Sequence, residues 1–118
     1  MTSAAGPVFV TTVLQLYLDL PDTPYRASSY DQAVARSLFE RGVPLDVVES
    51  ALLLGSLRRR RRPAGALPLS PVRSLAYFSP VIDEILQLPL PPAFHAYLRH
   101  QADEILRPVQ KSTFSRDR

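Results

Sequence analysis

The sequence contains no cysteine, which excludes disulfide bonds, thiolate metal ligands and thiol nucleophiles. Long apolar segments are also missing: the longest, such as residues 51–54, are far shorter than the ~20 residues that a transmembrane helix needs. Residues 1–7 lack a basic segment, and residues 8–20 are interrupted by polar side chains without a small-residue cleavage site after them, so we expect no signal peptide. Together these absences predict a cytoplasmic protein with no membrane association.

The chain also lacks the motifs of common active sites. It has no glycine-rich phosphate loop, Walker lysine, G-x-S-x-G or H-E-x-x-H sequence. His95 and His100 would lie about 140° apart around a helix, which makes joint metal ligation awkward. The carboxylate pairs 83–84 and 103–104 are typical of a helix surface. We therefore expect no enzymatic activity, no cofactor and no bound metal.

Length and composition are those of one ordinary globular domain. The 118 residues are 46% apolar and 21% charged, which suits a single packed core. Helical spacing recurs along the chain, and no segment shows a convincing strand pattern. The sequence predicts an all-α fold, a compact single-domain bundle of five to six short helices with Pro-rich connections. Within residues 1–118 we expect a flexible segment at 1–7, a loop at 63–69 and a disordered tail at 109–118.

The first helix is predicted over residues 8–20. Leu14, Tyr17 and Leu18 follow helical spacing there, although the threonine and valine content would also suit a strand. Residues 19–24 are expected to turn the chain.

A second helix is predicted to begin at Ser29. Gln32, three residues further on, could complete a capping box with this serine. Tyr30, Val34 and Leu38 then fall on one face of the helix, so we expect them to face the core.

The third helix is expected to be the most buried. Gly42 can take the left-handed conformation that ends a helix, and Pro44 suits the first position of the next one. Two adjoining apolar rows follow: Leu45, Val48 and Leu52, and Val47, Ala51 and Leu54. Pro63 disfavours helical geometry in the residue before it, so we expect this helix to end at 60–62.

Prolines divide the remaining sequence. Ser70-Pro71-Val72 predicts a helix start with serine as the cap, and Ser79-Pro80-Val81 repeats this pattern. Residues 71–88 therefore form either one kinked helix or two short helices that meet near Ser79. After a proline-rich link, apolar spacing predicts a last helix over 94–106.

Five consecutive arginines at 58–62 are the strongest functional signal. The formal net charge is +3 and would be negative without them, so the basic character is local. Guanidinium groups bind phosphates through paired hydrogen bonds, which predicts contact with the backbone of DNA or RNA. In a helix only Arg58, Arg61 and Arg62 would share a face. The predicted interface comprises Arg58, Arg59, Arg60, Arg61, Arg62 and Arg73, with Tyr77 and Phe78 as possible base-stacking residues if they lie beside the arginines.

Other interpretations stay open at this point. The arginines could form a solvated helix end that pairs with acidic residues, with Tyr77 and Phe78 in the core. A helix-turn-helix reading of residues 31–57 is rejected, because the second helix is too apolar to enter the major groove. The alternative function is a helical module for protein interaction or oligomerisation. Its docking residues would be Leu67, Leu69, Leu88 and Leu90.

Three segments, Tyr30–Ala35, Glu40–Pro44 and Arg73–Glu84, resemble helical domains of bacterial replication-initiation and primosome proteins, the DnaD-type among them. The similarity covers about half of the chain. It implies a DNA-linked scaffolding role in replication or mobile-element maintenance, with Tyr77 and Phe78 at the matching aromatic positions. The tryptophan usual after such an aromatic segment is missing, because this chain contains none.

Overall fold

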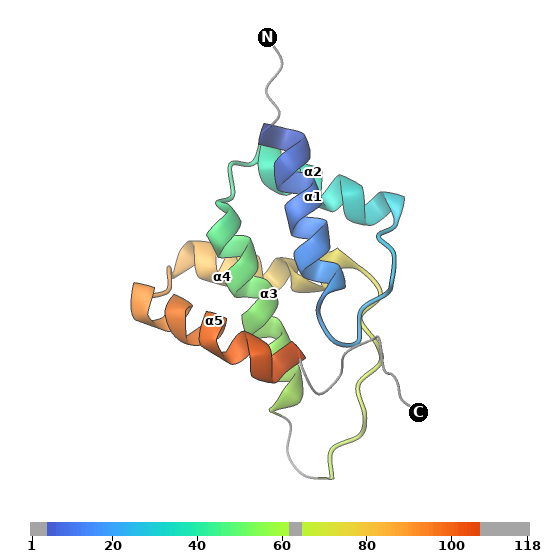
Figure 1. The fold of residues 1–118 in the computed structure, drawn as a ribbon, viewed down its shortest axis with the longest axis vertical. Coiled ribbons are helices and arrows are strands. Elements are labelled where there is room, and N and C mark those ends of the chain that lie inside the picture. The colour runs from blue at the N-terminus through green and yellow to red at the C-terminus, as the bar shows by residue number, and fades with distance from the viewer. Residues whose placement is uncertain (1–4, 62–64, 107–118) are drawn as a thin grey trace.

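The fold is an all-α bundle in the computed structural model, which describes residues 5–61 and 65–106, the last four of these by backbone alone. Within these ranges there is no strand, which confirms the predicted class. Figure 1 shows the helices. They are α1 (Ala5–Leu18), α2 (Ser29–Glu40), α3 (Leu45–Arg60), the 3₁₀ helix η1 (Leu75–Phe78), α4 (Ser79–Gln87) and α5 (Pro92–Leu106).

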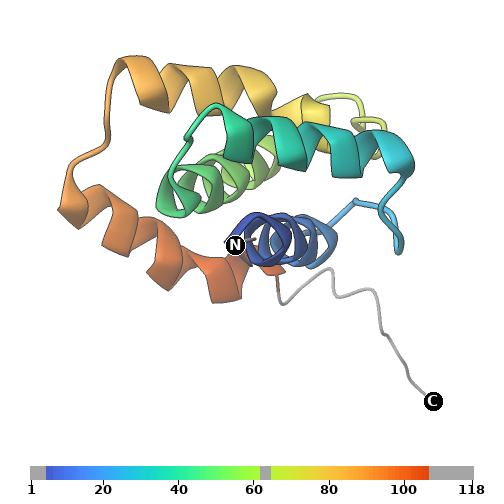
Figure 2. The same ribbon diagram turned by 90° about the horizontal axis from the view of Figure 1, so that it is seen from above.

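Helix α3 lies at the centre of the bundle and packs against α1, α4, α5 and η1 (Figure 2). Its residues 50–57 are all buried, and Val48, Ala51 and Leu52 are at most 1% exposed. The prediction that this helix is the most buried is therefore confirmed. Leu45 departs from the predicted apolar rows, because it lies at the first turn and is exposed.

Helix α1 begins earlier and ends earlier than the predicted 8–20. Residues 5–7, which we expected to be flexible, form its first turn, while residues 1–4 lie outside the described part. After Leu18 the chain turns, and the buried Thr23 hydroxyl donates hydrogen bonds to the carbonyls of Tyr17 (3.1 Å) and Leu20 (2.8 Å). The bond to Tyr17 is made to a carbonyl of the last helical turn, and the bond to Leu20 is made to the turn that follows.

The N-terminus of α2 corrects the predicted cap by one residue. Ser28, not Ser29, is the N-cap, and Asp31 instead of Gln32 completes the capping box. The buried face of the helix runs through Asp31, Ala35 and Leu38, whereas Tyr30, predicted to face the core, is 60% exposed. Aspartate was missed because a capping box is usually read from Glu or Gln at this position.

The turn between α2 and α3 forms as predicted around Gly42. This glycine has a φ of 75°, its N–H donates to the Phe39 carbonyl, and the Val43 N–H donates to the Leu38 carbonyl. The pair of bonds is a Schellman motif, which requires the left-handed conformation that glycine adopts without steric cost. Pro44 is the N-cap of α3 rather than its first helical residue.

Residues 65–74 contain no helix, so the helix predicted to start at Ser70-Pro71-Val72 is wrong. The segment instead runs extended against the bundle, with Val72 buried and its N–H donating to the Asp22 carbonyl at 2.8 Å. The Leu75 N–H donates to buried Asp31 Oδ1 at 2.9 Å. Bonds to distant parts of the chain therefore replace the helix that local capping signals predicted.

Two short helices meet at Ser79, which decides between the two alternatives for residues 71–88. Ser74 caps η1 by accepting a hydrogen bond from the Ala76 N–H, and α4 begins directly after η1 with Pro80 in its first turn. Helix α5 starts at Pro92, two residues before the predicted start. The predicted tail at 109–118 and the first residues of the loop at 63–69 lie outside the described residues.

Candidate functional site

Four of the five consecutive arginines lie at the C-terminal end of α3: Arg58, Arg59 and Arg60 in its last turn and Arg61 as its C-cap. Cations at this end interact favourably with the partial negative charge of the helix dipole. Arg62 lies outside the described residues. We call the group Arg58–Arg61 the arginine end of α3.

Arg58 is held by α4. Its Nη1 and Nη2 atoms donate to the two carboxylate oxygens of Glu84 at 2.9 and 2.6 Å, and both side chains are about half exposed. The hydrogen bond to Glu84 raises the pKa of the Arg58 guanidinium, and the same bond lowers the pKa of the Glu84 carboxyl. The pairing of arginines with acidic residues, one of the open interpretations, therefore occurs at this position.

Arg59 connects α3 to the segment that precedes η1 and to η1 itself. It donates to the Ser70 carbonyl at 2.9 Å and to the Tyr77 hydroxyl at 3.2 Å, and its guanidinium carbon lies 5.3 Å from the centre of the Tyr77 ring. Asp22 lies 3.6 Å away, and only 9% of the Arg59 side chain is exposed. Arg59 thus ties the extended segment 65–74 to α3 and is poorly placed to meet a phosphate.

The remaining arginines are more available. Arg61 Nη2 donates to the hydroxyl of Tyr97 on α5 at 2.9 Å, a neutral partner, and no carboxylate among the described side chains pairs with Arg61. Arg60 is exposed and has no hydrogen bond or ion pair to any described residue. Arg73 is exposed in the extended segment, and no contact joins it to the arginine end within the described residues.

The two aromatic residues predicted to stack on bases have different environments. Tyr77 is 46% exposed and, with Arg58 and Arg59, lines a recess of about 320 Å³. Phe78 is fully buried and packs edge-on against the Tyr17 ring, with the centroids 6.3 Å apart. Phe78 belongs to the core and cannot stack on a base, which corrects that part of the prediction. Its burial is possible because Gly55 on α3 has no Cβ where the ring lies.

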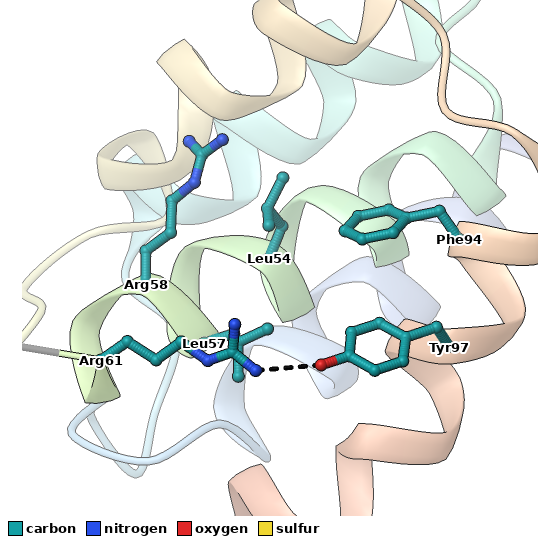
Figure 3. Close-up of a pocket in the computed structure, with 6 residues that line it drawn as sticks. All are labelled: Leu54, Leu57, Arg58, Arg61, Phe94 and Tyr97. Carbon is teal, nitrogen blue, oxygen red and sulfur yellow. Dashed lines mark hydrogen bonds between the residues drawn. The ribbon is translucent and has the colours of Figure 1, made fainter.

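A second, larger recess lies between α3 and α5 and was not predicted from the sequence. We call it the α3/α5 groove; it has a volume of about 520 Å³ (Figure 3). Leu54 and Leu57 form its floor, and Phe94 and Tyr97 form one wall, with their rings stacked at a centroid distance of 5.6 Å. Arg58 and Arg61, which were predicted to share a helix face, both line it. Helical spacing places Phe94 and Tyr97 on one face but does not show which helix they meet.

A polar contact between α3 and α5 was also missed. The Ser50 hydroxyl and Nδ1 of His95 share a hydrogen bond, and both residues line a recess of about 310 Å³ with Asp46. Arg99 of α5 donates to Glu49 of α3 at 2.7 Å beside it. These contacts join residues some 45 positions apart in sequence, and no local pattern indicates them.

Neither a metal site nor a membrane span is found in the described part of the chain. No three histidine, cysteine, aspartate or glutamate side chains there are grouped so that they could hold a metal ion. No helix there is both long and apolar enough to cross a membrane. Comparison with models of protein families, with curated proteins and with solved structures found no match to the chain.

Proposed function

We propose that this protein is a non-enzymatic accessory protein that binds the phosphate backbone of nucleic acid through the arginine end of α3. The observation that carries the proposal is the local excess of positive charge. Four arginines gather there, and the carboxylates paired with them within the described residues are Glu84 and Asp22. Arg60 and Arg61 are exposed, and neither forms an ion pair with a side chain that the structure describes.

A phosphate can also compete for Arg58. Its pairing with Glu84 is half exposed, and exposed ion pairs contribute little to stability because water screens the charges. Phosphate oxygens accept the same paired hydrogen bonds as a carboxylate. The contacts that we assign to nucleic acid are accordingly Arg58, Arg60 and Arg61, while Arg59 positions the segment beside them. Arg62 and Arg73 remain predicted contacts of the phosphate backbone.

The wider role follows from the resemblance to DnaD-type domains. That resemblance implies a place in replication or mobile-element maintenance, and thus in the cytoplasm. The proposal therefore includes a role in replication or mobile-element maintenance and a cytoplasmic location. The charge of the arginine end supports nucleic-acid binding itself but does not distinguish DNA from RNA.

The test is a fluorescence-anisotropy titration of labelled single- and double-stranded DNA and RNA over a range of salt concentrations. Three phosphate contacts predict a log–log slope of about −3 on duplex DNA, from about 0.9 per contact. A variant with Arg60→Ser and Arg61→Ser should lower the affinity and reduce the slope to about −1. The matched control carries Arg26→Ser and Arg36→Ser, two exposed arginines outside the arginine end, and removes the same charge. Absence of binding near physiological salt, or equal losses in both variants, would contradict the proposal.

A protein-interaction module is the second candidate, and exposed leucines favour it. Leu67 is 81% exposed and Leu88 is 77% exposed, both in proline-rich connections outside the helices. Exposed apolar side chains mark a docking site where they form a contiguous patch. Sedimentation of the wild type and of a Leu67→Ser, Leu88→Ser variant would test self-association. A monomer at all concentrations in both proteins would contradict oligomerisation through these residues.

A further inference from the structure

The α3/α5 groove combines aromatic side chains with positively charged ones. One wall is a pair of stacked aromatic rings, Phe94 and Tyr97, and one end carries two guanidinium groups, Arg58 and Arg61. The described lining contains no acidic residue. Figure 3 shows Phe94, Tyr97 and Arg61 around the floor made by Leu54 and Leu57, with Arg61 reaching Tyr97. Arg58 points away from the floor, toward α4, where Glu84 accepts its hydrogen bonds. The groove thus places aromatic rings next to a guanidinium group that can bind an anion.

From this arrangement we infer that the α3/α5 groove binds an unpaired nucleobase whose phosphate contacts Arg58 and Arg61. The inference rests on the proposed function and narrows its ligand to single-stranded nucleic acid. Phe94 and Tyr97 take the stacking role that was expected of Phe78, which the core has buried. Every base has a π-face, so aromatic stacking suits binding with little sequence preference.

The contact between Arg61 and Tyr97 explains how a base and its phosphate could be bound together. The Tyr97 hydroxyl accepts a hydrogen bond from Arg61 Nη2 at 2.9 Å, so the guanidinium lies at the edge of the aromatic wall. The hydroxyl proton of Tyr97 remains available for a phosphate oxygen, as do other N–H donors of Arg61. A base on the wall would therefore have its own phosphate within reach of Arg61.

Duplex nucleic acid cannot use this groove in the same way. The groove lies between two packed helices, and its floor residues Leu54 and Leu57 are each only 8% exposed. A paired base is already stacked on both faces and must leave the duplex to enter, which costs a few kcal/mol. The arginine end can contact the backbone of either form, so the groove predicts a preference for single strands.

The charges outside the groove favour nucleic acid over an acidic peptide. Arg60 follows Arg58 and precedes Arg61 on the same helix end, so positive charge continues beyond the groove lining. Such a series of cations matches a polymer with a regular repeat of phosphates. An acidic amphipathic peptide would use the groove but would leave Arg60 without a role, and it becomes an outcome of the test.

The experiment compares a labelled oligothymidine strand with a hairpin duplex by anisotropy, using wild type, Phe94→Leu and Tyr97→Leu. Leucine keeps the apolar surface but removes the aromatic face. We expect wild type to bind the single strand more tightly, and each variant to bind it about ten-fold more weakly. Duplex binding and its salt slope should be unchanged in Phe94→Leu, because the Phe94 side chain makes no hydrogen bond to the arginines assigned to the backbone, whereas Tyr97 does. Tyr30→Leu is the matched control, because Tyr30 is an exposed tyrosine on α2, and it should bind as wild type does. Far-UV circular dichroism checks that all variants fold.

Quenching of 2-aminopurine placed in the oligothymidine strand gives a direct reading of stacking, and Tyr97→Phe should retain it because the ring remains. Equal affinity for both nucleic acids, or equal loss of both in the leucine variants, would overturn the inference. If the Arg60→Ser, Arg61→Ser variant loses binding and the leucine variants do not, the result supports contact with the phosphate backbone and contradicts binding of a base in the groove. If no nucleic acid binds, both proposals fail. Binding of an acidic amphipathic peptide that depends on Phe94 and Tyr97 would then assign the groove to a protein partner.

Discussion

Tyr17 is completely buried in the core, and its ring and the Phe78 ring pack in a T-shaped arrangement. Its hydroxyl has no hydrogen-bond partner in the described part of the chain. Burial, and secondarily the charge of the Asp31 carboxylate, raises the pKa of Tyr17 to about 12. A buried hydroxyl without a partner destabilises the folded state, because unfolding returns it to water.

Replacing Tyr17 with phenylalanine should therefore increase the free energy of unfolding at pH 7, by roughly 1 kcal/mol. The substitution should also change the response to alkaline pH. An unfolded tyrosine ionises near pH 10, whereas the folded Tyr17 stays protonated up to about pH 12, so ionisation favours the unfolded state between these values. Wild type should lose stability over this window, and Tyr17→Phe should lose less. Urea unfolding from pH 7 to 11 measures both effects; a variant less stable than wild type at pH 7 would show that the hydroxyl is satisfied.

Gly55 is required by its neighbour rather than by its own backbone. A Cβ at this position would lie 2.7 Å from Cδ1 and 2.8 Å from Cε1 of the Phe78 ring. That ring is fully buried and cannot move aside without disturbing the core. Glycine inside a helix is otherwise unfavourable. At this position the loss in helix stability is offset by the space that glycine leaves for the Phe78 ring.

Gly55→Ala should destabilise the protein by roughly 1–3 kcal/mol, the usual range for overpacking a core. Helix propensity alone predicts the opposite sign, a gain of about 1 kcal/mol. Chemical denaturation distinguishes the two. A Phe78→Leu replacement in the Gly55→Ala background provides the control, because a smaller side chain should relieve the clash and make the two effects non-additive. A stabilised Gly55→Ala protein would show that the ring does not need this space.

At the scale of helices, the part of α5 whose side chains are described is attached to the bundle by apolar packing, with Leu98 buried, and by polar contacts to α3. Leu98 is fully buried, while Ser50 and His95 share a hydrogen bond at the edge of the interface. Glu49 and Arg99 form an ion pair nearby, with Arg99 largely exposed. The groove proposed to bind a base depends on this attachment, because α5 supplies its aromatic wall.

A double-mutant cycle with Ser50→Ala and His95→Ala should give a coupling energy of about 1 kcal/mol, as expected for a partly buried hydrogen bond. The cycle for Glu49→Ala and Arg99→Ala is the control. Its coupling should be smaller and should decrease further at high salt, because this pair is more exposed. Denaturant titrations at low and high salt provide both values. Zero coupling for Ser50 and His95 would mean that the bond does not hold the helices together.

At the scale of the whole molecule, one continuous core connects all the helices. Buried apolar residues come from α1 to α5, from η1 and from the extended segment through Val72. Asp31 links α2 to η1, and Arg59 links α3 to the extended segment. Since α3 packs against most other elements, none of them has a separate core.

We therefore predict a single cooperative unfolding transition in urea, with a slope of roughly 1–3 kcal/mol per M. Far-UV circular dichroism follows the helix content, and tyrosine fluorescence follows the packing of the core, because the chain has no tryptophan. We expect both signals to change at the same urea concentration. An earlier loss of helix content than of tyrosine signal would show that one helix, such as α5, unfolds on its own.

Local interactions determine most of the helix positions, which is why the sequence was sufficient for them. Gly42 ends α2 through its own left-handed backbone, and a run of apolar residues makes α3 the central helix. Errors arose where a distant residue competes with a local signal. Ser70-Pro71-Val72 has the signals of a helix start, yet the Val72 N–H bonds to Asp22 and the Ser70 carbonyl accepts from Arg59.

For the candidate site too, local properties could be predicted from the sequence and contacts with distant residues could not. The sequence alone determined that five arginines stand together after an apolar helix, because charge and helical spacing are local properties. Only the tertiary structure decided what each one contacts: Arg58 meets Glu84, Arg59 is largely buried beside Tyr77, and Arg61 lies at an aromatic wall from α5. An arginine side chain is long enough to reach other elements, so its partner depends on how the helices pack rather than on its neighbours in sequence.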